Sequence, residues 1–278
     1  IQTRPIEYSH GDVLLEGMLA WDDSSTEKRP GVLVVHEWWG HTPYARMRAD
    51  MLAEMGYTAF ALDMYGSGKL AEHPEDAKRF MTAVTSSMPV AEARFIKALE
   101  AADRVGARQM VLHSPYTRWY ENNVFSYPGY AENKLARIHD VLSPVLREAE
   151  KMGITLVIEN IHDVRPETRR AMVDSFGSKA IALSIDTGHA QLARRMSGAP
   201  PVEDFVRDAG NQLAHVHLQD VDGHADRHWA PGEGEIEWAA VFRALASCEN
   251  RPHLVLELRN TADIPKGFRC LEQLGLAA

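Results

Sequence analysis

Four acidic or imidazole side chains stand at the ends of apolar, strand-like segments in the second half of this sequence. They are Glu159 in LVIEN, Asp186 in SIDTGH, His217 in HVHLQD and Glu257 in LVLELR. Three carboxylates and one imidazole form a donor set that suits Mn²⁺, Mg²⁺, Co²⁺ or Zn²⁺. Without a cation, carboxylates crowded together repel one another and some must take up protons. The set therefore predicts a divalent-metal site, although each residue alone would more often cap a helix or pair with an arginine.

Further imidazoles lie close to these four residues in the chain. His189 follows Asp186 by three residues, and His215 precedes His217 by two, so a regular strand points the last two to the same side. We expect His217, nearer the strand end, to bind a metal and His215 to support it. The glycine-rich segment DVDGHADRHWAPGEGEI that follows has the composition of a mobile loop over a substrate, or of an ordinary solvated loop.

A repeating strand and helix pattern must position these residues. In the first part, residues 5–20 indicate two short strands around a His-Gly-Asp turn, and GVLVVHE (31–37) and YTAFALDMYG (57–66) are typical of strands buried on both faces. Helices are expected over 44–55 and over most of 74–105, with a break around 86–89. Two successive βα units indicate a parallel α/β fold.

The same alternation continues to the end of the chain. Strands are expected at RQMVLHSPY, ITLVIEN, IALSIDTGH, LAHVHLQD and HLVLELR, separated by helices near 132–152, 167–175, 202–209 and 238–246, with a closing helix near 266–274. In a β/α barrel the carboxyl ends of the strands meet at one rim, where the chemistry takes place. The polar residues that end these five strands, which include His113, are therefore expected together at that rim.

Composition narrows the classes of partner. With 278 residues the chain has room for one barrel-sized domain or two smaller ones. A net charge of −9 and the lack of an extended basic cluster make nucleic acid an unexpected partner, and no apolar run approaches the length of a membrane span. No sequence pattern indicates an oligomeric state. The start IQTRPIEYSHGD lacks the features of a signal peptide, and Cys248 and Cys270 have no CxxC spacing, so reduced thiols and a cytoplasmic location are expected.

The motifs LVIEN, SIDTGH, HVHLQD, DRHWAPGEG and LVLELR, in this order, resemble the xylose-isomerase-like TIM barrel superfamily over residues 101–278. That superfamily includes sugar phosphate isomerases, epimerases and endonuclease IV. The resemblance implies a metal held by Glu159, Asp186, His217 and Glu257, with His189 near the substrate or a further metal. Two more matches come from the endonuclease branch. They imply a second metal site at Asp226 and His228, and a metal-binding or substrate-binding role for His113.

The first hundred residues resemble another family. GVLVVHEWWG and RADMLAEMGYTAFALDMYGSGK are similar to the amino-terminal part of the dienelactone hydrolase family, which has an α/β-hydrolase fold, and Glu37 falls where that family keeps a glutamate near its nucleophile. The likeness ends near Glu100, and no GxSxG or GxCxG motif occurs in the chain, so a hydrolase triad is not expected. We expect a fragment over 1–100, with a hairpin and two βα units, joined to barrel strands 4–8 over 101–278, as two domains or one merged domain.

The leading hypothesis is a metal-dependent isomerase or epimerase of a sugar or sugar phosphate. Glu159 and Glu257 would transfer a proton next to the substrate carbonyl, and His189 and Arg259 would orient substrate oxygens. A second hypothesis is a zinc-dependent phosphodiesterase of the endonuclease IV kind, which Asp226 and His228 favour and the lack of basic clusters disfavours. A third is a dienelactone-type hydrolase, and a fourth is an inactive hybrid that binds a metal without turnover.

Overall fold

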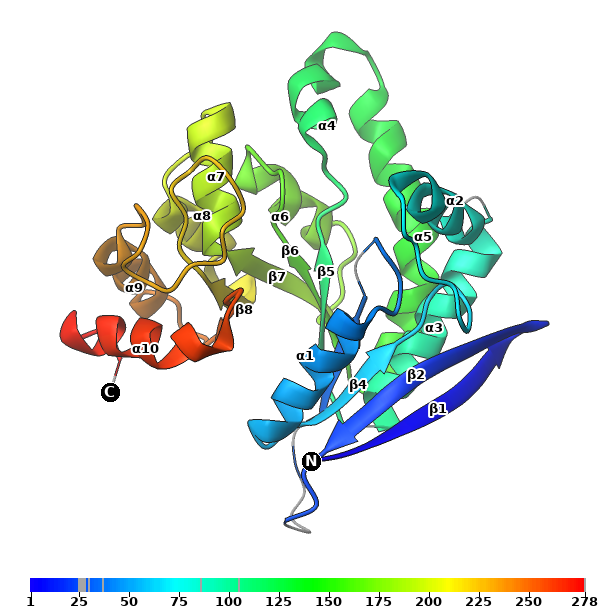
Figure 1. The fold of residues 1–278 in the computed structure, drawn as a ribbon. Coiled ribbons are helices and arrows are strands. Elements are labelled where there is room, and N and C mark those ends of the chain that lie inside the picture. The colour runs from blue at the N-terminus through cyan, green and yellow to red at the C-terminus, as the bar shows by residue number, and fades with distance from the viewer. Residues whose placement is uncertain (25–28, 30, 37, 86, 105, 278) are drawn as a thin grey trace. The chain divides into compact units, whose positions relative to one another are not determined.

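The computed structural model describes residues 1–277 except 25–28, 30, 37, 86 and 105 (Figure 1). Glu37, the glutamate of the hydrolase-like segment, therefore lies outside the described residues. The chain divides into two compact units. The first comprises Ile1–Met110 and Asp140–Thr155, and the second comprises Val111–His139 and Leu156–Ala278.

The first unit contains a mixed four-stranded sheet in the order β1-β2-β4-β3. Its strands are β1 (Gln2–His10), β2 (Val13–Trp21), β3 (Gly31–Val35) and β4 (Thr58–Leu62). β1 and β2 form the predicted antiparallel hairpin, whose turn places Gly11 at φ 56°. β3 pairs parallel with β4, as expected for successive βα units, whereas β2 pairs antiparallel with β4.

Small side chains allow the helix and sheet of this unit to approach closely. Ala20 of β2 and Ala59 and Ala61 of β4 pack with Ala49 and Ala53 of the helix α1 (Pro43–Glu54). The remaining helices are α2 (Pro74–Thr85) and α3 (Met88–Arg104), which are separated where the sequence predicts a break.

The five predicted strands of the second half form one sheet in sequence order, β5-β6-β7-β8-β9. They are β5 (Gln109–His113), β6 (Thr155–Glu159), β7 (Ile181–Asp186), β8 (Leu213–Leu218) and β9 (His253–Leu256). The pairs from β6 to β9 are all parallel. Sequential parallel strands joined by helices are the arrangement of a β/α barrel, so the fold class is α/β with a parallel half-barrel.

Helices connect these strands and follow the last of them, as Figure 1 shows for the chain from green to red. They are α4 (Arg118–Asn123), η1 (Val124–Ser126), α5 (Tyr130–Met152), α6 (Pro166–Asp174), α7 (Thr187–Ser197), α8 (Val202–Ala209), η2 (Gly210–Gln212), α9 (Trp238–Ala246), η3 (Thr261–Asp263) and α10 (Ile264–Gln273). Helices α4 and α7 are absent from the sequence-based prediction. Among the described residues, no helix combines the length and apolar character that crossing a membrane requires.

The central strands of this sheet carry the apolar core beneath the candidate site. Leu156, Ile158, Leu183 and Ile185 are each no more than 1% exposed. Arg169 of α6 is equally buried, and its Nη1 donates to the carbonyl oxygens of Ile158 at 3.2 Å and Ser184 at 2.7 Å. A buried guanidinium that donates to main-chain carbonyls of two strands fixes the helix against the sheet.

Candidate metal centre

The four residues predicted to bind a metal gather at the carboxyl edge of the half-barrel. Glu159 ends β6, Asp186 ends β7, His217 is the last but one residue of β8, and Glu257 follows β9. The strand register pairs Asp186 with His217. Parallel pairing in sequence order therefore brings these side chains to one edge of the sheet, as the spacing predicts.

His217 lies at the centre of this group. Its Nδ1 is 2.6 Å from Oε2 of Glu159 and 3.1 Å from Oε2 of Glu257. This nitrogen is buried, and its contacts with the described residues do not have the geometry of a hydrogen bond. One ligand atom each from Asp186, His217 and Glu257 also lie within 4.8 Å of one another. Carboxylate oxygens and an imidazole nitrogen that converge this closely are the donor set that a divalent metal prefers, so the residues suit such an ion.

A second group of donors consists of His189, Asp226 and His228. Oδ2 of Asp226 is 3.5 Å from Nε2 of His189 and 3.1 Å from Nε2 of His228. His228 has a φ of 51°, a left-handed backbone conformation that is uncommon for a residue other than glycine. Its Nδ1 is 3.0 Å from the carbonyl oxygen of Glu257, which holds the ring in place. Strained residues of this kind cluster at functional sites.

The remaining predicted site residues differ in their surroundings. Nε2 of His113 lies 3.6 Å from Oε1 of Glu159, although the side chain of His113 is 59% exposed. The ring centroids of His113 and His189 are 6.0 Å apart, so His113 lies at the edge of both donor groups. Arg259 is exposed, and its backbone N–H donates to the carbonyl oxygen of His228 at 2.9 Å. Its guanidinium forms no ion pair with any described residue.

Gln219, which the sequence motifs do not single out, connects the two donor groups. Its Nε2 donates to both carboxylate oxygens of Asp186, at 3.1 and 3.2 Å, and to Oδ1 of Asp226 at 3.1 Å. Its Oε1 accepts the backbone N–H of His228 at 3.0 Å. The side chain is fully buried. One amide thus orients candidate ligands from both groups. In the sequence, only its position next to Asp220 in the motif LQD could have drawn attention to it.

Two further buried polar residues support the site. Asn160 follows Glu159, and its Oδ1 accepts the backbone N–H of Asp186 at 2.9 Å. Ser184 contacts Oε2 of Glu159 at 3.3 Å and Nδ1 of His215 at 3.1 Å through its hydroxyl group. His215 and His217 face the same side, as strand alternation predicts, with ring centroids 4.6 Å apart. Hydrogen bonds of this kind fix the orientation of residues that hold a metal.

Asp220 organises the loop after β8 and does not face the donor groups. Its carboxylate accepts hydrogen bonds from Nε1 of Trp238 at 2.9 Å and from the backbone N–H groups of Gly232 at 2.8 Å and Val221 at 3.0 Å. A Cβ atom on Gly234 would lie 2.3 Å from the Asp220 carboxylate, so glycine is required there. The part of this loop around Asp220 is therefore a hydrogen-bonded and buried structure.

The electrostatics of the site favour an added positive charge. Burial opposes charge on His189 and His217, yet the surrounding carboxylates raise the pKa of His189 to about 10 and that of His217 to about 9. Burial raises the pKa of Asp186 to about 6. Burial also works against charge on Glu159, but His113 and His217 hold the pKa of that carboxyl well below its usual range. The carboxylates hold protons on neighbouring imidazoles, where a bound cation would replace that charge.

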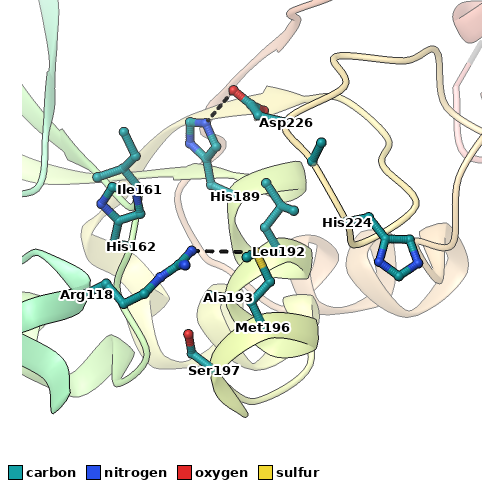
Figure 2. A pocket seen from close by; sticks show the side chains of 11 residues that line it. Arg118, Ile161, His162, His189, Leu192, Ala193, Met196, Ser197, His224 and Asp226 are labelled. Carbon is teal, nitrogen blue, oxygen red and sulfur yellow. Dashed lines mark hydrogen bonds and ion pairs between the residues drawn. The ribbon is translucent and has the colours of Figure 1, made fainter.

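A cavity of about 310 Å³ opens beside the second donor group. Figure 2 shows His189 and Asp226 joined on one side, Arg118 and His162 on another, and Met196 beside the Arg118 guanidinium. A concave site next to converging donors has the general form of a small-molecule site.

Comparison with known proteins identifies the family. Residues 89–274 match the model of the xylose isomerase-like TIM barrel. The chain belongs to this family. Residues 15–146 match the model of the dienelactone hydrolase family, so both resemblances in the sequence are confirmed, although the hydrolase match extends beyond Glu100, where the sequence motifs end.

Curated relatives of this xylose isomerase-like chain match only parts of it. An uncharacterized protein of Methanocaldococcus jannaschii is 27% identical over 184 residues, which is 63% of this chain and 59% of the relative. A putative carboxymethylenebutenolidase of Aquifex aeolicus is 33% identical over 103 residues, which is 36% of this chain and 38% of the relative. The chain thus spans less than two thirds of the length of these relatives.

Solved structures confirm the fold of the xylose isomerase-like part. A D-tagatose 3-epimerase-like protein aligns with a TM-score of 0.59 at 20% identity, covering 87% of each chain. A Thermus thermophilus protein whose crystal was soaked with ZnCl₂ has a TM-score of 0.52 at 26% identity, covering 74% of this chain and 72% of that one. An L-ribulose 3-epimerase has a TM-score of 0.51 at 17% identity, covering 90% and 95%. Sugar epimerases thus share this fold.

Proposed function

We propose that this protein is a divalent-metal-dependent isomerase or epimerase of a small sugar or sugar phosphate. The observation that carries the proposal is the convergence of Glu159, Asp186, His217 and Glu257 at the carboxyl edge of a parallel half-barrel. Membership of the xylose isomerase-like family and the fold shared with sugar epimerases support it.

Those four residues would hold Mn²⁺, Co²⁺, Mg²⁺ or Zn²⁺. When bound, such an ion polarises a substrate carbonyl and makes the neighbouring C–H more acidic. The second group, with His189 and Asp226, lies against the cavity and is placed to orient hydroxyl groups of a substrate. His113, the last residue of β5, lies near Glu159 and is placed to contact the substrate as well.

The two glutamates provide the proton transfer. Oε2 of Glu159 and Oε2 of Glu257 approach the same atom, Nδ1 of His217, from β6 and from the end of β9. A substrate bound at this edge of the sheet would have both carboxylates within reach. One glutamate removes the proton next to the carbonyl, and the other returns a proton to the opposite face or to the adjacent carbon. The first outcome is epimerisation and the second is isomerisation.

Deuterium exchange tests this proposal. Purified protein, reconstituted separately with each of the four metals, is incubated with a panel of aldoses, ketoses and their phosphates in D₂O, and NMR follows exchange next to the carbonyl. We expect Glu159→Gln and Glu257→Gln to reduce exchange at least about 100-fold, since each removes a group that moves the proton. The exposed Glu272→Gln serves as the matched control. Full exchange in both site variants refutes the assignment, and metal binding without exchange on any sugar supports an inactive hybrid.

A zinc-dependent phosphodiesterase is the second candidate, because His189, Asp226 and His228 bring one ligand atom each within 4.8 Å of one another. A nicking assay on abasic-site DNA with zinc-loaded protein separates it from the isomerase. Zinc-dependent nicking that Asp226→Asn abolishes would favour the phosphodiesterase, as would two or three zinc ions per chain by plasma mass spectrometry. No nicking together with sugar exchange leaves the isomerase.

A further inference from the structure

The cavity beside the donor groups contains cationic and polar groups that the proton transfer does not use. Arg118, the first residue of α4, and His162, in the loop after β6, line it together with His189 and Asp226. Arg118 and His162 lie along the same side of the cavity in Figure 2. The cavity therefore has two ends of different chemistry, one with His189 and Asp226 of the second donor group and one with a guanidinium.

Arg118 has no carboxylate to neutralise it among the described residues. Its side chain is exposed, and no described carboxylate lies within 4.0 Å of the guanidinium. Its side chain makes a weak contact, from Nη2 to the thioether sulfur of Met196 at 3.5 Å. By contrast, Arg165 is 2.7 Å from Glu121 and Arg227 is 3.0 Å from Asp222. The N–H donors of the Arg118 guanidinium thus remain available to a ligand in the cavity.

His162 adds a second donor at the same end. Partial burial lowers the pKa of His162, and the nearby Arg118 guanidinium lowers it further, which favours the neutral imidazole with one N–H to donate. Ile161, Leu192 and Met196 supply apolar lining around this end. A volume of about 310 Å³ lies at the lower end of the range for small-molecule sites, which limits the ligand to a single small sugar unit.

We propose that Arg118 and His162 form an anion-binding subsite, and that the substrate is a sugar carrying a phosphate or carboxylate group. This inference rests on the proposed function. The guanidinium presents paired N–H groups that match the oxygens of either anion. With the anionic group at Arg118, the sugar chain extends along the cavity toward His189 and Asp226.

Binding of three matched sugars to metal-loaded protein tests the subsite. Glucose, glucose 6-phosphate and glucuronate differ only at carbon 6, which is uncharged, phosphorylated or carboxylated. We expect calorimetry to show at least about tenfold tighter binding of one or both charged sugars than of glucose, because hydrogen bonds between charged groups are stronger than those between neutral groups. Preference for glucose 6-phosphate assigns a phosphate, and preference for glucuronate assigns a carboxylate.

Arg118→Met should remove this preference and leave the affinity for glucose and the metal content unchanged. His162→Gln, which keeps an N–H donor, should retain most of it. The control is Arg194→Met on α7, which removes the same charge from an exposed position outside the cavity lining. Equal or absent binding of all three sugars, or an unchanged preference in Arg118→Met, overturns the subsite. If the preference depends on Arg118 but no sugar exchanges deuterium, the subsite stands and the isomerase proposal fails.

Discussion

Gln219 shows how one uncharged side chain determines the arrangement of several charged ones. Its amide donates to Asp186 and to Asp226, and its carbonyl oxygen receives the backbone N–H of His228. These hydrogen bonds hold Asp186 and Asp226 in fixed orientations relative to each other. The amide can do this because it donates and accepts at the same time, which a carboxylate at position 219 could not do.

Replacing Gln219 should therefore weaken metal binding without removing a ligand. We expect Gln219→Leu to reduce metal affinity about 10-fold to 100-fold, the usual effect of removing a group that orients metal ligands. Competition with a chromophoric chelator measures the affinity. The exposed Gln273→Leu on α10 is the control and should bind metal as the unchanged protein does. Unaltered affinity in Gln219→Leu would show that the amide does not position the ligands.

His41 should make the first unit sensitive to acid. Burial lowers the pKa of His41 to about 4. The nearby charges of Arg46 and His36 lower this pKa further, whereas the Asp63 carboxylate raises it. The unfolded chain has a histidine pKa of about 6.5, so it binds more protons than the folded chain between about pH 6.5 and 4. The contribution of His41 to stability is complete above about pH 6.5 and is lost as the pH falls through this window.

Urea denaturation at about pH 7.5 and about pH 4.5 checks this. His41→Asn cannot be protonated, so we expect its free energy of unfolding to fall less on acidification than that of the unchanged protein, by on the order of 1 to 3 kcal/mol. His73→Asn, at an exposed position, should retain the full fall. If the free energy of unfolding fell equally in the unchanged protein and in both variants, His41 would not have a lowered pKa in the folded state.

Some site residues could be predicted from the sequence and others could not, for chemical reasons. Glu159, Asp186 and His217 could be anticipated because a charged or imidazole group at the end of an apolar run is unusual wherever it occurs. Gln219 could not, because a glutamine has no chemistry that marks it in a sequence. Arg118 could not either, because its significance lies in having no carboxylate partner among the described residues, which only three-dimensional contacts reveal.

At the scale of elements, the direct transition from β7 into α7 places two candidate ligands together. Asp186 ends the strand and also caps the helix, since its Oδ1 accepts the backbone N–H of His189 at 2.7 Å. The first turn of α7 must pass close to Gln219. A Cβ atom on Gly188 would lie 2.4 Å from Cδ of that side chain, so glycine allows the helix and the amide to occupy adjacent positions.

Gly188→Ala should therefore depart from the usual effect of this substitution. Alanine within a helix normally stabilises by roughly 1 kcal/mol relative to glycine. At position 188 we expect the opposite, a lower midpoint of thermal unfolding together with weaker metal binding, because the methyl group displaces Gln219. Arg194→Ala, at an exposed position of the same helix, tests the effect of alanine alone and should change the midpoint little. A stabilised Gly188→Ala protein with normal metal affinity would contradict this account of the close contact.

Helices and strands whose apolar residues recur at a regular spacing could be predicted from the sequence. Elements that lack such a spacing could not. The apolar run IALSID predicts β7, and WAAVFRALA predicts α9. Helix α7 escapes prediction because TGHAQLARRMS begins without a separate loop, and its N-cap is Asp186, whose place at a strand end indicates a metal ligand instead. Helix α4 has six residues, too few for a helical period to be distinguished from a loop.

At the scale of the whole molecule, two family patterns share one chain. The hydrolase match covers residues 15–146 and the barrel match covers 89–274, so the two overlap around α3, β5 and α5. A βα unit has much the same pattern in both folds, which is why motifs in the sequence indicate both families. The assignment of residues 140–155 to the first unit depends on tertiary contacts, which no linear pattern encodes.

The last prediction concerns the effect of the metal on the whole chain. Asp186 and Glu159 are at most 1% exposed, and Asp226 lies close by, so removing a bound cation leaves negative charges close together in a buried setting. We expect metal removal by EDTA to lower stability by about 2.7 kcal/mol, relative to protein in metal at about 100 times its dissociation constant. Hydrogen exchange followed by mass spectrometry locates the change. Amides of β6, β7 and β8 should lose protection, whereas those of the β1–β2 hairpin, which contains none of the candidate ligands, should change least.

Asp186→Asn distinguishes loss of the metal from a general effect of the chelator. It removes one ligand and one of the repelling charges together. Its stability should therefore no longer depend on EDTA. An EDTA effect that persists in Asp186→Asn, or that falls equally on β1–β2 and β6–β8, would place the metal elsewhere than at these strand ends. An effect confined to β6–β8 would mean that the half-barrel depends on its metal for stability as well as for the proposed chemistry.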